Sequence, residues 1–169
     1  MTTEFQQREE GGDSYHPWVA AVVAGLVAGT GMGLILSVGT RLLPLIGALY
    51  GMGSFVGGWV AHLANSVVFA LVFAAVLSRP IVRRESMSLS TYVGLGVGYS
   101  AFLGLVTGGV IFPLWVNAGI DAGLPLPFVP IPGLGGFGSA LAFGFAHIVY
   151  GVILGPVYAL VSRSVPTRP

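Results

Sequence analysis

Charge is the property this sequence lacks most. Only 8% of its 169 residues are charged; seven of these are Arg, six are Asp or Glu, and none is Lys. Soluble domains carry about 25% charged residues, whereas 54% of this chain is hydrophobic. The composition argues against a soluble globule. A net charge of +1 also provides no field that would attract nucleic acid, so no nucleic-acid partner is expected.

Cysteine is absent, which excludes disulfides, thiolate zinc sites, iron–sulfur ligation and a thiol nucleophile. The apolar stretches contain no Asp, Glu, Lys or Arg that could form a proton relay or a charged substrate site. The glycine-rich residues 133–138 do not follow a strand pattern, so they do not form a phosphate loop. The sequence therefore predicts no catalytic residues and a protein that is not an enzyme.

Long apolar runs are what the chain has instead. A helix needs roughly 20 mostly apolar residues to cross about 30 Å of hydrocarbon, and four stretches meet this requirement. They are Pro17–Ser37, Val56–Ser78, Thr91–Phe112 and Gly138–Ser162. The sequence thus predicts an all-α fold, a four-helix transmembrane bundle over residues 17–162, in contact with membrane lipid.

The arginines are distributed unevenly between the two sides of such a bundle. With four spans, both termini and the link between spans two and three lie on one side. That side carries Arg8, Arg79, Arg83, Arg84, Arg163 and Arg168. The other side has only Arg41. Because arginine-rich short loops remain in the cytoplasm, we expect a plasma-membrane protein with a disordered acidic tail over 1–16, a tail over 163–169, and both tails cytoplasmic.

An internal repeat relates spans two and four. A shift of 85 residues superimposes nine identical residues in 28 positions, including the pair His62 and His147. Each repeat, about 17–78 and 91–162, is predicted to be a helical hairpin. The two hairpins then have the same orientation in the membrane, as parallel repeats do.

Glycines at four-residue spacing recur in three of the spans. Such spacing lets helix backbones approach closely, and it predicts a tight bundle. Any glycine face left over favours a homo-oligomer or a partner helix from another membrane subunit. The glycines are Gly25, Gly29 and Gly33, then Gly94 and Gly98, Gly104 and Gly108, and Gly151 and Gly155.

The stretch 113–137 is unusual for a loop because it holds five Pro and a single charge. It has no helical or strand pattern and is too apolar for a solvated linker. We expect it to lie on the bundle, on the surface of the outer leaflet or on another subunit.

The histidine pair is the main candidate site. His62 lies 17 residues before Arg79, and His147 lies 16 residues before Arg163. At about 1.5 Å per residue the two imidazoles are level with each other in the outer half of the membrane. An ionisable residue within a span is by default a functional-site hypothesis.

The neighbours of the pair suggest a ligand. Asn65 lies one turn from His62, and Tyr150 and Gly151 lie one turn from His147. Two neutral imidazoles that face one another can be the axial ligands of haem b, and Gly151 would leave room for the macrocycle. Alternatively, they can bind copper. Met32 and Met52 are the other soft ligands expected in the outer half. Three interpretations stay open: a haem or metal site, a proton or substrate path, and two histidines that only bond across helices.

The segments GWVAHLANSVVFALVFA (58–74) and GFAHIVYGVILGPVYAL (144–160) resemble a family of small four-span membrane proteins of haloarchaea and some bacteria. The resemblance covers about residues 17–162 and implies the repeat and the positions of the two histidines. In that family a Gly, a His and a Tyr-Gly or small pair recur in spans two and four, and Asn65 replaces the Tyr. Some members are labelled histidine kinases, but this chain has no room for an ATP-binding domain.

The function predicted from these features is a noncatalytic accessory subunit of a larger, respiratory membrane complex, with haem b or a metal between His62 and His147. The alternative is a small channel or transporter that uses the interior of the bundle. A third hypothesis is an independent haem or copper electron carrier.

Overall fold

The computed structural model describes residues 17–40, 42–79, 81–82, 87–120 and 134–163. Within these residues the chain is helical, which confirms the all-α prediction. The helices are α2 (Pro17–Gly39), α3 (Leu43–Ala48), α4 (Phe55–Leu77), α5 (Leu89–Val106), the π-helical turn η1 (Thr107–Ile111), α6 (Phe112–Ile120) and α7 (Gly135–Arg163). The predicted tails lie outside the described residues, apart from Arg163 at the end of α7.

The described residues contain four helical segments that are long and apolar enough to cross a membrane: Pro17–Val38, Phe55–Leu77, Leu89–Gly119 and Gly135–Ser162. Two of them begin at serine caps. The Ser54 hydroxyl accepts the amide of Gly57 at 3.0 Å, and the Ser88 hydroxyl accepts that of Thr91 at 3.2 Å. Each cap satisfies an amide that the first helical turn leaves unpaired. The four predicted spans are confirmed, and the chain is a multi-pass membrane protein.

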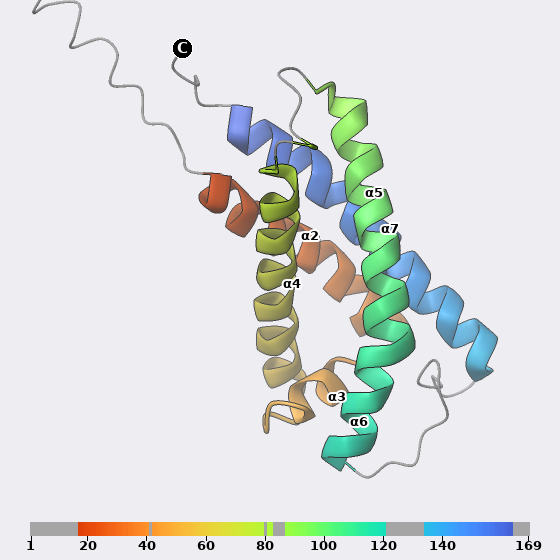
Figure 1. Ribbon diagram of the computed structural model, residues 1–169. Coiled ribbons are helices and arrows are strands. Elements are labelled where there is room, and N and C mark those ends of the chain that lie inside the picture. Colours follow the sequence, from red (N-terminus) through yellow and green to blue (C-terminus); the bar gives the residue numbers. More distant parts are fainter. Residues whose placement is uncertain (1–16, 41, 80, 83–86, 121–133, 164–169) are drawn as a thin grey trace, which may run out of the picture.

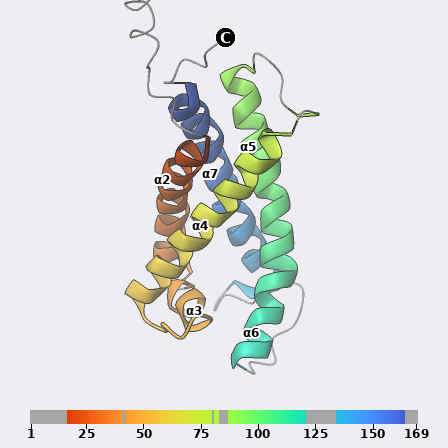
Figure 2. The ribbon, with the colours of Figure 1, turned by 60° about the vertical axis from the view of Figure 1, so that its left-hand side comes forward.

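The helices pack as two hairpins that meet through their central pair. α2 packs on α4, α5 packs on α7, and α2 packs on α7. The start of α2 and the end of α7 define one end of the bundle, which we call the termini end; α3 and α6 lie at the opposite end, the far end (Figure 1). α4 and α5 form no extensive interface, and they diverge toward the far end (Figure 2).

This arrangement departs from closed twofold symmetry between the hairpins. If α2 and α4 were equivalent to α5 and α7, the close packing of α2 on α7 would be matched by close packing of α5 on α4, which the described residues do not show. The parallel repeat therefore stays a prediction. The open side of the bundle lies between α4 and α5.

Glycine brings the backbones of α5 and α7 together. A Cβ on Gly96 would collide with the carbonyl oxygen of Gly151, and one on Gly155 would collide with that of Tyr92. By contrast, a Cβ on Gly94 or Gly98 would meet nothing within 4 Å. Gly94 and Gly98 are therefore a glycine face left over by the packing of the bundle, whereas the α5 face that meets α7 is the one that carries Gly96.

The third span is longer than predicted. Helix continues beyond Phe112 to Ile120, so the first part of the stretch 113–137 is not an irregular loop. Pro113 has no amide to donate to the carbonyl four residues earlier, and η1, where the hydrogen-bond register changes, ends just before α6. The π-helical turn thus precedes Pro113, the first residue after the predicted end of the span. Residues 121–133 lie outside the described residues.

The two neighbouring glycines of α5 provide a matched test of this packing. Gly96→Ala should destabilise the fold by about 1–3 kcal/mol, because α7 backbone lies where the methyl group would go. Gly94→Ala should be neutral or stabilising by up to about 1 kcal/mol, because the site is open and alanine favours helix. Thermal unfolding followed by circular dichroism in detergent measures both. Equal unfolding midpoints for the two variants would contradict the assigned helix face.

Candidate functional site

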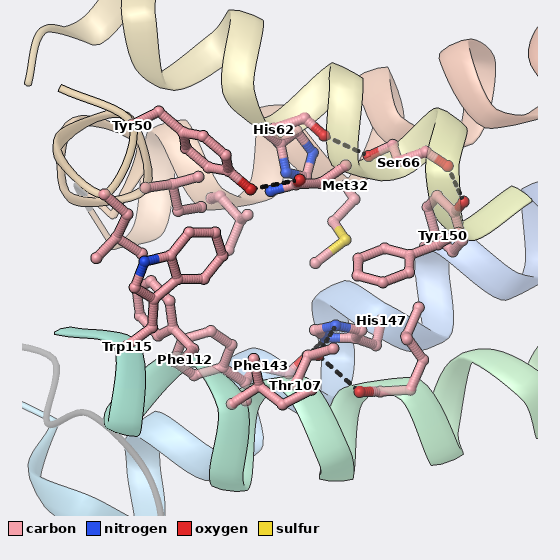
Figure 3. Close-up of a pocket in the computed structure, with 18 residues that line it drawn as sticks. Met32, Tyr50, His62, Ser66, Thr107, Phe112, Trp115, Phe143, His147 and Tyr150 are labelled. Atoms are coloured by element: carbon pink, nitrogen blue, oxygen red, sulfur yellow. Dashed lines mark hydrogen bonds between the residues drawn. The ribbon is translucent and has the colours of Figure 1, made fainter. Parts of the chain in front are cut away.

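A cavity of about 130 Å³ lies where α4 and the α5–α6 segment diverge. α2 and α7 contribute its inner wall, and α3 closes it from the far end (Figure 3). Its lining residues are Met32, Leu36, Ile46, Leu49, Tyr50, His62, Asn65, Ser66, Phe69, Leu103, Thr107, Gly108, Ile111, Phe112, Trp115, Phe143, His147 and Tyr150. None of them is Asp, Glu, Lys or Arg. The cavity is mostly apolar, with polar groups at a few defined points.

The structure brings most of the predicted site residues together around this cavity. His62 on α4 and His147 on α7 face it from opposite sides, with Met32 between the two helices (Figure 3). Both imidazoles are buried, at 5% and 6% exposure. Asn65 and Tyr150 also line the cavity.

Gly151 and Met52 do not belong to the site. A side chain on Gly151 would collide with the Ser100 hydroxyl and the backbone of Gly96, so α5 fills the space that was expected to admit a macrocycle. Met52 lies in the turn before α4, is 40% exposed and does not line the cavity. Met32 is therefore the only one of the two proposed methionine ligands that is at the site.

His62 is held by the neighbouring helix. Its Nε2 lies 2.9 Å from the carbonyl oxygen of Gly29 on α2. A carbonyl only accepts hydrogen bonds, so Nε2 carries the proton of the neutral ring and Nδ1 carries the lone pair. Nδ1 has no hydrogen-bond partner among the described residues. Among the described residues no fully buried side-chain nitrogen or oxygen lacks a partner, so Nδ1 is not fully buried. Because His62 lines the cavity, we infer that the Nδ1 lone pair is accessible from it.

His147 has the opposite arrangement. Its Nδ1 lies 2.8 Å from the carbonyl oxygen of Phe143, one turn earlier in α7, so Nδ1 is the donor and Nε2 carries the lone pair. Nε2 lies 3.3 Å from the Thr107 hydroxyl, but that hydroxyl donates its single proton to the Leu103 carbonyl at 2.6 Å. The lone pair of Nε2 is therefore weakly engaged. Each histidine presents an acceptor nitrogen at the cavity.

Tyrosine hydroxyls connect the helices around the two histidines. Tyr150 donates to the Ser66 carbonyl oxygen at 2.6 Å, joining α7 to α4. Tyr99 donates to the Phe69 carbonyl oxygen at 2.8 Å, joining α5 to α4 on the termini side of the cavity. Tyr50 donates to Asn65 Oδ1 at 2.7 Å and packs edge-on against Trp115 at 5.0 Å between ring centroids. These contacts bound the cavity at both ends.

Sequence reasoning did not assign Tyr50, Thr107 or Trp115 to the site. Tyr50 and Trp115 lie outside the four predicted spans, and only the fold of α3 and α6 brings them to the cavity. Thr107 begins the π-helical turn. The glycine pair Gly108-Gly109 that follows was a signal for an irregular helix, since π-helical turns occur frequently at functional sites.

Comparisons with protein-family models, curated proteins and solved structures find no match to this chain. The resemblance to the small four-span haloarchaeal proteins therefore stays a prediction. The function has to be argued from the site and from the lipid-facing surface.

Proposed function

We propose that this chain is a noncatalytic integral membrane accessory subunit that holds a small guest between His62 and His147 and associates with a partner helix. The observation that carries the proposal is the arrangement of the two histidines. Both are buried at one cavity, and each keeps an acceptor nitrogen available after its N–H has bonded a backbone carbonyl. Two histidines that served packing alone would need no shared cavity.

The size of the cavity limits what the guest can be. About 130 Å³ is close to the volume of an apolar protein cavity that holds one benzene molecule. A porphyrin has four pyrrole rings and does not fit such a space, and Gly151 gives no further room. The geometry therefore favours a small guest over haem b.

Copper is the second candidate guest. Met32 Sδ and the two lone-pair nitrogens form a soft donor set that suits Cu(I), and all three residues line the cavity. The described residues contain no group of three or more His, Cys, Asp or Glu side chains that could hold another metal ion. A single copper ion would use only part of the cavity.

A channel or transporter is supported less well. The cavity lies in the far half of the bundle, and the Tyr99–Phe69 contact joins α5 to α4 on its termini side. Beyond that contact the core is filled by residues such as Phe73, Ala74 and Leu77, which are at most 6% exposed. A pocket that closes in the middle of the bundle suits binding better than passage.

The outer face of α5 supports association with a partner. Gly94 and Gly98 leave a shallow strip with nothing above it, and Phe102 and Leu105 continue this strip at 65% exposure each. Small residues at four-residue spacing let a second helix pack closely in a membrane. We assign this face of α5 to a helix of another membrane subunit.

A double substitution tests the association. Gly94→Leu with Gly98→Leu should fill the strip and reduce the complex extracted in mild detergent to the single chain, without lowering thermal stability, because both sites are open. Gly144→Leu on α7, which is equally open, is the matched control and should leave the complex intact. Size-exclusion chromatography with light scattering gives the masses. A complex that survives the double substitution, or a wild-type chain that always runs alone, would refute the partner assignment.

We further propose that the termini lie in the cytoplasm and the far end lies outside the plasma membrane, as the distribution of arginine indicates. The chain has no cysteine, so single cysteines report orientation cleanly. Ser90→Cys, near the termini end, should resist an impermeant maleimide in intact cells and react after lysis. Ala118→Cys, on α6, should react in intact cells. The reversed pattern would overturn the orientation.

A further inference from the structure

The acceptor nitrogens define what kind of molecule the cavity can hold. Nδ1 of His62 and Nε2 of His147 present lone pairs, and each ring's proton is committed to a backbone carbonyl. The two residues lie on opposite sides of the cavity (Figure 3). Among the described residues, no charged side chain lines the cavity to balance an ionic guest. The complementary guest is neutral and has a hydrogen-bond donor at each of two opposite ends.

The walls between the two histidines suit a flat ring. Phe69, Phe112, Phe143 and Trp115 line the cavity, and aromatic side chains pack favourably against other rings. The volume of about 130 Å³ matches one six-membered ring. The volume, the aromatic walls and the two opposed acceptors together favour a monocyclic aromatic ring with hydroxyl groups at its two opposite (para) positions.

The rim of the cavity indicates where such a ring enters. Tyr50, Ile111 and Trp115 line the cavity and are also 42%, 47% and 39% exposed. Tyr50 lies in the turn after α3, Ile111 in η1 and Trp115 in α6, on the side where α4 and α5 diverge (Figure 2). In a membrane-spanning bundle this side faces lipid rather than water. A guest that enters here arrives from the bilayer, and any alkyl tail it carries can remain there.

We propose that the cavity binds the headgroup of a lipid quinol, with one hydroxyl donating to Nδ1 of His62 and the other donating to Nε2 of His147. The inference rests on the ligand-binding role proposed above and names its ligand class. The quinol is bound and released unchanged, so no electron acceptor is required. The oxidised quinone has two carbonyl oxygens and no hydrogen-bond donor. At each histidine a carbonyl oxygen would face a nitrogen lone pair, and no hydrogen bond could form. The site is selective for the reduced form.

The direct test uses the full chain in phosphatidylcholine nanodiscs and three probes of equal tail length: a decyl-benzoquinol, the corresponding quinone and decylbenzene. Bound probe is measured after separation from free probe, and empty nanodiscs correct for partition into lipid. The quinol should bind at one per chain, about tenfold or more tighter than either other probe, because only it pairs both lone pairs. If decylbenzene or the quinone binds as tightly as the quinol, the proposal is wrong.

Variants at the histidines separate hydrogen bonding from packing. His62→Phe and His147→Phe should each weaken quinol binding about tenfold. His62→Asn and His147→Gln place an oxygen near the position of the lost acceptor, Nδ1 or Nε2, and should keep most of the binding. Gly136→Ala, at an open position near the start of α7, is the control and should bind like the wild-type chain. Loss of binding in the Asn and Gln variants, with unfolding midpoints unchanged, would contradict the assigned acceptors.

Copper competition distinguishes a quinol site from a copper site between the two histidines. Buffered Cu(I) added to quinol-loaded nanodiscs should leave the bound quinol in place. Stoichiometric Cu(I) binding with release of quinol would assign the histidines to a metal and overturn the quinol site.

The quinol site and the accessory role can fail independently. A chain that binds no quinol but keeps its partner through α5 would overturn this inference alone. Loss of the partner with quinol binding retained would overturn only the accessory role.

Discussion

The structure depends on one constraint: a polar side chain inside an apolar bundle must find a hydrogen-bond partner. Water is scarce in the hydrocarbon region, and an unsatisfied polar group there costs several kcal/mol. His62 meets this constraint on the Gly29 carbonyl of another helix, and His147 meets it on the Phe143 carbonyl of its own helix. Because carbonyls only accept, both bonds decide which nitrogen of each ring is protonated. The backbone hydrogen bond of each ring therefore determines which nitrogen can accept a hydrogen bond from a guest.

Glycines on the neighbouring helices leave room for the two imidazoles. On α2, side chains at Gly29 and Gly33 would collide with Ser66, Trp59 and the edge of the His62 ring. On α5, a side chain at Gly104 would collide with the ring of His147. Each imidazole thus packs against a glycine of its hairpin partner. The hairpins then pack extensively through α2 and α7, whereas α4 and α5 meet only locally, at contacts such as Tyr99–Phe69. The cavity lies on the side left open.

Much of this architecture could be predicted because it depends on local composition. The spans follow from apolar length, and the common depth of His62 and His147 follows from helix rise. Because the two histidines lie at the same depth, the sequence could predict that they share one site. The tautomers, by contrast, depend on which carbonyls the rings reach, and no sequence pattern specifies this. The cavity volume depends on the divergence of α4 from α5, which is a tertiary feature.

Two features of α5 and α6 could not be read from the sequence. Four-residue spacing identifies a small-residue face, but it does not identify the neighbour, so the pattern does not show that Gly96, rather than Gly94 or Gly98, contacts α7. The third span was predicted to end at Phe112, but the π-helical turn shifts the hydrogen-bond register before Pro113 and the helix continues as α6. Helix existence was predictable in both places. Helix rotation and helix extension were decided by packing and by backbone register.

The central claim is that both histidines are neutral and present their lone pairs to one cavity. Nitrogen NMR of chains with isotopically labelled histidine in lipid bilayers measures this directly, with His16 replaced by Gln and each remaining signal assigned through a single-histidine variant. The account predicts two neutral rings of different tautomers, His62 protonated at Nε2 and His147 protonated at Nδ1. Two rings of the same tautomer, or a doubly protonated ring at neutral pH, would contradict it.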